Sequence, residues 1–346
     1  MKRWVAIHTG LPHYLDHLGV LSINLNLPLL VTEKKSFEIA VRYYPHLSVK
    51  FIDLRDLTLE YLASHFDVIF ESGHLWAAEL VPLFELFFKK KMRIVYCPHG
   101  NSDKKVVISK RLSKDISLLY GHHMFHLLHQ TGELQKLHGY VFTGNYRLQH
   151  YLNHQSLYDA LFLEAMQGKF ISHKKWMLYA PSWSHKKDPS SFVFHCEKVI
   201  QEVGVFYHLI IKWHPFLYED YPGHIEYLLG KYEKLQNLSF LHDFPCIYPI
   251  LNHVEGYIGD FSSIGYDALA LNKPLYFLDH HDGDIYNSGI LLSLKKHLGR
   301  SIYEEQKQDR FEKKRKKLCE YVFGETKEST KIESEIKRAL SQERTL

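Results

Sequence analysis

The sequence predicts an α/β protein with two doubly wound domains, each built on a parallel β-sheet that helices cover on both faces. Short apolar runs of strand length alternate with longer segments of helical character, which is typical of βα units. This alternation begins again after a helical segment at 153–167, so the pattern occurs twice. The chain has 346 residues, more than one typical core supports, which also favours two domains.

Strands are predicted where a short apolar run ends in Gly, Ser, Thr, Pro or His. Helices are predicted between several of them, including 77–91 and 109–129. We expect an N-terminal domain over 1–155 and a C-terminal domain over 170–302, because the strand pattern restarts between them. The predicted strands are 4–10, 27–32, 49–54, 67–72, 93–100 and 140–145 in the first half, and 175–183, 207–215, 238–242, 256–263 and 274–279 in the second.

Composition narrows the class of protein. Hydrophobic residues make up 45% and charged residues 24% of the chain, which excludes a disordered or collagen-like protein. The net charge of +4 is too small to indicate nucleic-acid binding, but it suits an anionic ligand or an anionic membrane surface. The four cysteines, Cys97, Cys196, Cys246 and Cys319, form no C-x-x-C pair and indicate neither a disulfide framework nor a zinc knuckle.

We expect a cytoplasmic protein. The apolar run after the N-terminal basic residues is too short for a signal peptide, and no apolar stretch reaches the roughly 18 to 20 residues that span a bilayer. The segment 80–93, LVPLFELFFKKKMR, is apolar with a basic end and could contact anionic lipid on the inner membrane face. The simpler interpretation is an amphipathic core helix whose basic end is solvated.

In parallel α/β sheets, ligands bind at the carboxyl ends of strands, and two facing sheets create a cleft. The strand segment EGYIG stops at Asp260, and Ser262 and Ser263 begin a predicted helix. The first turn of a helix has unpaired N–H groups, so serine hydroxyls there either cap the helix or bind a phosphate. Both interpretations remain open for these serines.

Two further strand ends carry histidines. Lys212 and His214 are two residues apart in IIKWHP, so their side chains project from the same side of the extended backbone. A cation beside an imidazole suits a pyrophosphate, with Lys212 holding the charge and His214 donating to an oxygen or protonating a leaving group. His99 follows the strand in VYCPHG, and its pKa range suits a general base for an acceptor hydroxyl. Ser182 is a candidate phosphate or ribose contact, and Arg147 a candidate anion clamp.

Taken together, these segments resemble the CDP-glycerol glycerophosphotransferase family of teichoic acid synthesis. The resemblance covers roughly residues 93–325 and is strongest over 175–279. PHGNSDK is similar to the family's His-Gly segment, FTGNYR, with Gly144, to its Thr-Gly-x-x-Arg segment, and YAPSW to its strand-end Tyr-Ala-Pro-Ser/Thr-Trp. KWHP and GDFSSIGYDALALNKPLYF are similar to its two most specific segments.

The resemblance implies a GT-B fold, in which two Rossmann-like domains face a cleft. It implies that His99 and His214 are catalytic, and that His214 and the Ser-Ser region handle the donor diphosphate. It implies that no metal or other cofactor is required. It also implies that residues 303–346 form C-terminal helices, one of them over 303–322, that pack across the domain joint. The sequence departs from the family pattern at Gly259, at Lys212 and after Gly100, where the usual Thr-Pro is absent.

The acceptor side is less well marked. HYLDHLG follows the first predicted strand, and Asp16 and His17 could form an orienting pair for an acceptor hydroxyl, with His17 in a catalytic role. Equally, they are an acidic residue near a helix N-terminus and a surface histidine. Two His-rich groups, His122, His126 and His129 on one helical face and Asp279, His280, His281, Asp282 and Asp284 in DHHDGD, could hold a metal, but with 25 histidines such groups arise easily, and we assign no metal site.

The sequence therefore predicts a transferase that moves a glycerol-phosphate or related unit from a nucleotide-diphosphate donor to a hydroxyl-bearing glycan or lipid-linked acceptor. A nucleotide-sugar glycosyltransferase or a UDP-sugar 2-epimerase of GT-B fold is an alternative enzyme. A catalytically inert GT-B relative that binds anionic glycans is an alternative of another class.

Overall fold

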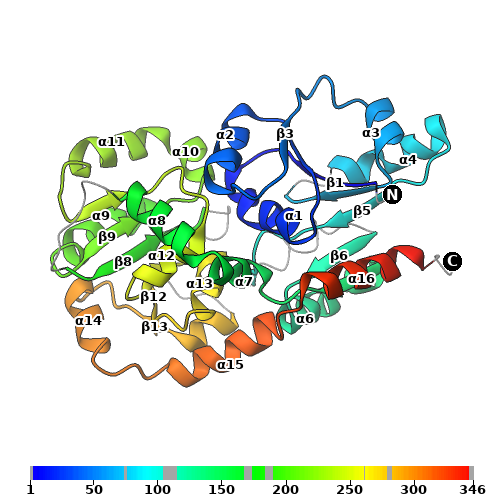
Figure 1. The fold of residues 1–346 in the computed structure, drawn as a ribbon. Helices are drawn as coiled ribbons and strands as arrows, with labels where there is room; N and C mark the ends of the chain where they lie inside the picture. The colour runs from blue at the N-terminus through cyan, green and yellow to red at the C-terminus, as the bar shows by residue number, and fades with distance from the viewer. Residues whose placement is uncertain are drawn as a thin grey trace. The chain divides into compact units, whose positions relative to one another are not determined.

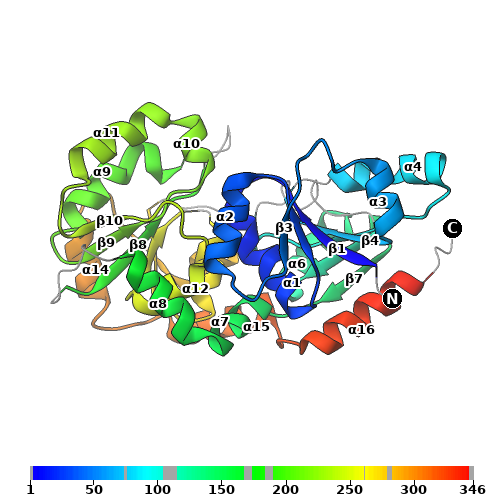
Figure 2. The same ribbon diagram turned by 45° about the horizontal axis from the view of Figure 1, so that its top comes forward.

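The computed structural model describes residues 3–73, 76–103, 115–166, 174–183, 190–260, 262–278 and 283–342. The chain forms two compact units (Figures 1 and 2). Unit 1 consists of Met1–Asn153 and Tyr321–Leu346, and unit 2 of His154–Glu320. Each unit contains one sheet in which every strand pair is parallel, so the predicted α/β class with two parallel sheets is confirmed.

The sheet of unit 1 has seven strands in the order β3-β2-β1-β4-β5-β6-β7. Its central strands are almost entirely apolar and buried, as expected for a parallel sheet with both faces covered. The order reverses beside β1, which pairs with β2 on one side and with β4 on the other. The strands are β1 (Trp4–His8), β2 (Leu29–Val31), β3 (Val49–Phe51), β4 (Val68–Glu71), β5 (Arg93–Tyr96), β6 (Ile116–Leu119) and β7 (Gly139–Phe142).

The helices of unit 1 follow the strands, and the C-terminal helix returns to this unit. α16 buries Ile332 and Ile336, and the Arg93 guanidinium on β5 donates to the Leu340 carbonyl at 2.5 Å, which fixes the end of α16 beside the sheet (Figure 1). The helical segments are η1 (Pro12–Tyr14), η2 (Leu15–Gly19), α1 (Val20–Asn24), α2 (Lys34–Tyr43), α3 (Leu59–His65), α4 (Trp76–Phe88), α6 (His122–Gln130), η3 (Leu134–Lys136), α7 (Tyr146–Asn153) and α16 (Ser329–Ser341).

The sheet of unit 2 has six strands in the order β10-β9-β8-β11-β12-β13. Tyr179, Leu209 and Ile258 on its three central strands are fully buried and belong to one apolar core. The strands are β8 (Trp176–Ala180), β9 (His208–Ile211), β10 (Leu238–Phe240), β11 (Tyr257–Gly259), β12 (Leu275–Phe277) and β13 (Ile290–Leu291), and the helical segments are α8 (Gln155–Ala165), α9 (Ser191–Val203), α10 (Phe216–Asp220), α11 (Pro222–Tyr232), α12 (Ile247–His253), α13 (Ser263–Leu269), η4 (Asp284–Ser288), α14 (Leu298–Glu305) and α15 (Glu312–Phe323).

One predicted helix contains a strand. Residues 109–129 were expected to be helical, but the described part forms β6 followed by α6. The run Ile116–Leu119 is short, apolar and fully buried between β5 and β7. A short apolar run fits a buried strand as well as a helix, so periodicity alone does not separate the two.

The expected single helix over 303–322 is interrupted. α14 ends at Glu305 and α15 begins at Glu312. The Asp309 carboxylate accepts the Phe311 backbone N–H at 3.3 Å and also pairs with the buried Arg315 guanidinium, so this segment forms a turn before α15. Within unit 2, the Arg315 guanidinium also donates to the Asn272 side-chain oxygen at 3.0 Å and to its carbonyl at 3.2 Å. The last residues of α15 belong to unit 1, where Tyr321 bonds to His126. In the described parts of the chain, no helix is both long and apolar enough to cross a membrane.

Candidate active site

The candidate donor residues of unit 2 gather at one edge of the sheet. β9, β8 and β11 are adjacent and parallel, so their carboxyl ends lie side by side. Lys212 and His214 follow β9, Ser182 follows β8, and Asp260, Ser262 and Ser263 follow β11. The structure therefore brings together six residues that the sequence spreads over 182–263.

Asp260 organises this edge through backbone groups. Its carboxylate is buried and accepts the Ser182 N–H at 2.6 Å and the Ser191 N–H at 2.7 Å. The Ser190 hydroxyl contacts the same carboxylate at 3.4 Å and also accepts the Phe192 N–H at the start of α9. Asp260 thus connects the end of β11 to the loop after β8 and to the N-terminus of α9. A direct contact between Asp260 and the nucleotide donor stays a prediction.

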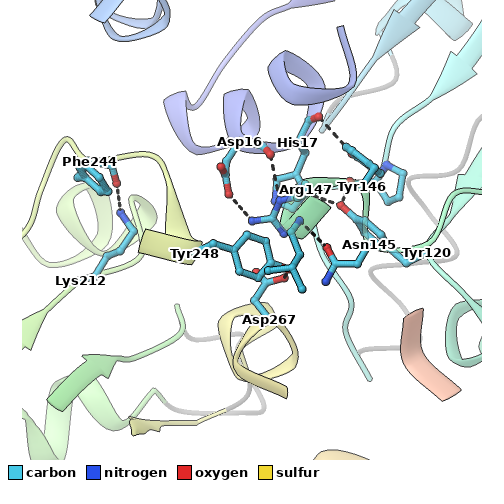
Figure 3. A network of polar contacts seen from close by, with 12 residues as sticks. Asp16, His17, Tyr120, Asn145, Tyr146, Arg147, Lys212, Phe244, Tyr248 and Asp267 are labelled. Atoms are coloured by element: carbon cyan, nitrogen blue, oxygen red, sulfur yellow. Dashed lines mark hydrogen bonds and ion pairs between the residues drawn. The ribbon is translucent and has the colours of Figure 1, made fainter. Parts of the chain in front are cut away.

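The two serines have different local roles. Ser262 is the N-cap of α13, and its hydroxyl accepts the Ile264 N–H at 3.3 Å, so the capping interpretation holds for this residue. Ser263 is the first residue of α13 and is half-buried. α13 is held against α12 by the Tyr248 hydroxyl, which donates to the Asp267 carboxylate at 3.2 Å (Figure 3).

The end of β9 fixes Lys212 and His214. The Lys212 ammonium donates to the Phe244 carbonyl at 2.6 Å (Figure 3), and its backbone N–H donates to the Tyr179 carbonyl at 3.0 Å. The Nδ1 atom of His214 accepts the Phe216 N–H at 3.2 Å. Because Nδ1 uses its lone pair in this bond, neutral His214 carries its proton on Nε2. His214 therefore presents an N–H donor, the form that suits a phosphate oxygen.

In unit 1, Asp16 and His17 lie in η2, a short π-helical segment after β1 in which both side chains are buried. They do not form the expected pair, because neighbouring residues on a helix point in different directions. Asp16 pairs instead with Arg147 of α7, whose Nε also donates to the Asp16 carbonyl at 3.0 Å (Figure 3). The Tyr44 hydroxyl donates to the same carboxylate at 3.3 Å.

The ring of His17 contacts Tyr120, which directly follows β6. Its Nδ1 lies 2.6 Å from the Tyr120 hydroxyl (Figure 3). Burial lowers the pKa of His17 well below 6.5, and the nearby Arg147 guanidinium lowers it further. His17 is therefore a neutral imidazole at neutral pH.

His99 is the third residue after the end of β5 and lies next to other aromatic rings. Its ring centroid is 4.6 Å from that of Tyr14 and 6.3 Å from that of His13. Tyr14 packs on Gly73, where an added Cβ would lie 2.3 Å from the Tyr14 ring. The ends of β1, β4 and β5 thus meet at Tyr14, and His99 belongs to this cluster.

Gly144 and Arg147 have structural roles within unit 1. Gly144 has a φ of +66°, and a Cβ there would lie 2.4 Å from Cα of Thr326, so the glycine admits the segment that leads to α16. The Arg147 side chain is buried and paired with Asp16. Donor binding by Gly144 and Arg147 stays a prediction for which these contacts give no support.

The described residues do not support a metal site. Among the described residues, no group of three or more His, Cys, Asp or Glu side chains could hold a metal ion. His126 of the first His-rich group bonds to the Tyr321 hydroxyl at 2.9 Å. Asp284 begins η4, and the other members of DHHDGD, residues 279–282, lie outside the described residues.

Several residues of these networks were missed from the sequence. Tyr120 was overlooked because β6 was read as helix, although a tyrosine followed by glycine after an apolar run is a usual strand end. Ser190 and Ser191 carried a weak signal, since a serine before a helix commonly caps it. Tyr146 and Tyr14 carried none.

The two units, each built on a parallel sheet covered by helices, have the GT-B fold. Residues 164–308 match the model of the CDP-glycerol:poly(glycerophosphate) glycerophosphotransferase family, which confirms the resemblance seen in the sequence. The matched range, under half of the chain, includes all six strand-end residues of unit 2 and none of the candidates in unit 1.

Solved structures show the same fold. The structure of S. aureus MnaA with UDP is similar over 99% of this chain and 99% of that chain, with a TM-score of 0.63 and 15% identity. A variant of the wall teichoic acid polymerase TagF with CDPG is similar over 98% of this chain and 88% of that chain, with a TM-score of 0.60 and 14% identity. A putative UDP-N-acetylglucosamine 2-epimerase from Listeria monocytogenes is similar over 100% and 98%, with a TM-score of 0.62 and 11% identity. Among proteins of curated function, none matches this sequence significantly.

Proposed function

We propose that this protein is a glycerophosphotransferase that uses CDP-glycerol, or a closely related CDP-alcohol, in the synthesis of a cell-envelope polymer. The observation that carries the proposal is that Lys212, His214 and Ser263 follow β9 and β11, the two strands on either side of β8, at the same edge of the sheet of unit 2. All three lie inside the range that matches the glycerophosphotransferase family model. The bound CDPG of the TagF variant, a protein of the same fold, also supports a CDP-linked donor.

The proposed reaction is a substitution at phosphorus. An acceptor hydroxyl attacks the phosphorus that carries glycerol, the bond to the CMP oxygen breaks, and CMP leaves with the electron pair. Lys212 balances the charge of the diphosphate, and the Nε2–H of His214 donates to a phosphate oxygen or to the departing CMP. By this proposal protein groups neutralise the leaving group, so no metal or other cofactor takes part.

On the acceptor side, we assign His99 as the base that takes the proton of the attacking hydroxyl. The proposed acceptor is a glycan or lipid-linked molecule that bears a hydroxyl group. The location of His99 just after β5, beside Tyr14 and His13, supports this role because the carboxyl edge of a parallel sheet is where ligands bind.

A turnover assay tests the activity. Purified full-length protein is mixed with CDP-glycerol and a glycerol-phosphate-primed acceptor, and CMP release is followed. We expect release that requires the acceptor and is lost in His99→Ala and in His214→Ala, with melting temperature retained. His129→Ala, which removes an exposed histidine of α6, is the matched control and should keep full activity. Binding without turnover on CDP-, UDP- and CMP-linked donors would instead favour the inert binding protein.

The alternative of a UDP-sugar enzyme rests on the similarity to MnaA with UDP and to the putative 2-epimerase, which extends over almost the whole chain. Lys212 and the Nε2–H of His214 also suit a UDP-linked diphosphate. UDP-N-acetylglucosamine is therefore included in the assay. Epimerisation or transfer of the sugar, with no CMP release from CDP-glycerol, would replace the primary proposal.

We further propose that the protein works in the cytoplasm and contacts the inner face of the membrane through the end of α4. Leu86, Phe87 and Phe88 there are 61%, 64% and 38% exposed, although Phe84 one turn earlier is fully buried. Lys89 and Lys91, which follow directly, are exposed as well. Three adjacent apolar side chains next to cations suit an anionic lipid surface.

Vesicle flotation tests this contact. We expect the protein to float with vesicles rich in phosphatidylglycerol and not with phosphatidylcholine alone. Phe87→Ser should weaken flotation several-fold, whereas Phe194→Ser, which removes a 69% exposed phenylalanine of unit 2, should not. Equal flotation of both variants and wild type would contradict the contact, and a concentration-dependent dimer that Phe87→Ser dissolves would assign the surface to a second copy.

A further inference from the structure

The hydrogen bonds around His17 select one of its two neutral forms. The Tyr120 hydroxyl lies 2.6 Å from His17 Nδ1 and 3.2 Å from the Pro98 carbonyl oxygen. A carbonyl oxygen can only accept, so a Tyr120 hydroxyl that bonds to both atoms gives its single proton to Pro98. In this arrangement the Tyr120 oxygen accepts from His17, which places the imidazole proton on Nδ1 and leaves the lone pair on Nε2.

Two further hydrogen bonds fix the backbone of η2. The Tyr146 hydroxyl donates to the His17 carbonyl at 3.2 Å, and Arg147 Nε donates to the preceding carbonyl of Asp16 at 3.0 Å. The rings of Tyr120 and Tyr146 stack with centroids 5.8 Å apart and planes 13° from parallel. Residues that follow β6 and β7 therefore fix both the position and the ring orientation of His17.

In this arrangement His17 and His214 have opposite neutral tautomers. His17 has its proton on Nδ1 and offers a lone pair at Nε2, whereas His214 has its proton on Nε2 and offers a donor. A lone pair suits a hydroxyl group, which must donate its proton, and an N–H suits a phosphate oxygen, which must accept one. Each histidine is thus in the form that its proposed side of the reaction needs.

We propose that Tyr120 is a positioning residue for the acceptor: it keeps His17 in the Nδ1–H form so that Nε2 accepts a hydrogen bond from an acceptor hydroxyl. His17 then binds and orients the acceptor, while His99 removes the proton of the attacking hydroxyl. The assignment of the hydroxyl ligand rests on the proposed function. The tautomer itself is a property of the protein alone.

Nuclear magnetic resonance tests the tautomer without substrate. Long-range proton–nitrogen correlations of protein labelled in its histidine rings distinguish the two neutral forms, and the spectrum of His17→Gln identifies the His17 signals by their loss. We expect wild-type His17 to have its proton on Nδ1, and Tyr120→Phe to show the other form or a mixture. A wild-type proton on Nε2, or an unchanged His17 signal in Tyr120→Phe, would overturn the proposal even if transfer activity were found.

Kinetics test the consequence for the acceptor. Tyr120→Phe keeps the ring and its stack on Tyr146, and we expect it to lower kcat/KM for the acceptor about tenfold, a fraction of the 10² to 10⁴ typical of positioned acid–base groups. The KM for CDP-glycerol should stay unchanged. Tyr207→Phe is the control, because it also removes a buried hydroxyl, one that donates to Gln306 at 2.8 Å, in unit 2.

The outcomes separate this inference from the proposed function. Equal activity of Tyr120→Phe and Tyr207→Phe, with wild-type transfer intact, would refute the positioning role and leave the glycerophosphotransferase proposal standing. Absent transfer in wild type would refute the proposed function, while the tautomer would still be decided by the spectrum.

Discussion

The guanidinium of Arg147 contacts both the carboxylate and the backbone carbonyl of Asp16, which lies 131 residues earlier in the chain. Both side chains are almost completely buried, at 2% and 9% exposure. Arg147 lies in the first turn of α7 after β7, and Asp16 lies in η2 after β1. The pair therefore joins segments that follow two strands, β1 and β7, which three other strands separate in the sheet of unit 1. The pair sets the position of η2 and hence of His17.

Removal of one partner of this pair should be costly. Arg147→Ala leaves a buried carboxylate without its cation, and we expect a loss of about 3 to 5 kcal/mol in the free energy of unfolding. Chemical denaturation measures it. The double variant with Asp16→Ala should lose less than the sum of the two single losses, because the uncompensated charge is gone. Additive losses would contradict the pairing.

The two serines at β11 should separate capping from donor binding. Ser262→Ala removes the N-cap of α13 and should cost about 1 kcal/mol of stability, with donor affinity nearly intact. Ser263→Ala removes no cap and should weaken CDP-glycerol binding about tenfold or more at unchanged stability, since a hydrogen bond to a charged group contributes roughly 1.5 to 3 kcal/mol. Melting curves measure the stability of both variants, and titration calorimetry measures their affinity for CDP-glycerol. Loss of stability without loss of affinity at Ser263 would make it a purely structural residue.

Gly144 should tolerate no side chain. In Gly144→Ala the new Cβ would meet the Thr326 and Glu325 backbone at 2.4 and 2.5 Å in a left-handed conformation, so we expect a loss of more than about 2 kcal/mol in unfolding free energy. Gly230→Ala in α11 is the matched control: nothing lies within 4 Å of its Cβ, and helix propensity predicts a gain of up to about 1 kcal/mol. Equal effects of the two substitutions on the denaturation midpoint would argue against the docked C-terminal segment.

Stability should fall in mild acid because of buried His8. Burial lowers the pKa of this imidazole from 6.5 to about 4, so between these values the unfolded chain binds more protons than the folded one. Unfolding free energy therefore decreases as the pH falls through this window, by about 2 kcal/mol from pH 6.5 to pH 5 for this group. Between pH 7 and pH 5, the free energy of unfolding of His8→Gln should fall by about 2 kcal/mol less than that of wild type. Chemical denaturation at several pH values measures this difference. Equal dependence of the unfolding free energy on pH in the two proteins would contradict the assignment.

The carboxyl ends of β8, β9 and β11, where the candidate donor residues lie, could be predicted from the sequence because these strands are buried on both faces. β8, β9 and β11 are near-continuous apolar runs, so their ends, and the polar residues after them, are visible in the chain. Once the strands were known to be parallel, the placement of Lys212, Ser182 and Asp260 at one edge followed. Which neighbours these residues bond to did not follow, since Asp260 reaches groups about 70 to 80 residues away.

The acceptor side was predicted less well for a physical reason. Its residues depend on contacts between segments that no local pattern connects, such as Asp16 with Arg147 and His17 with Tyr120. The sequence pattern predicts a helix where β6 lies, so the strand end before Tyr120 is not apparent from the sequence. A tyrosine hydroxyl acquires its role only from the acceptor and donor that the fold brings to it.

Isothermal titration of the full-length protein with CDP-glycerol, UDP-N-acetylglucosamine and a CMP-linked sugar tests the central claim most directly. The account predicts that CDP-glycerol binds most tightly and that Lys212→Ala weakens this binding about ten- to a hundredfold, which corresponds to the loss of one charge-assisted contact. Tight binding of the UDP-sugar alone, unaffected by Lys212→Ala, would contradict it.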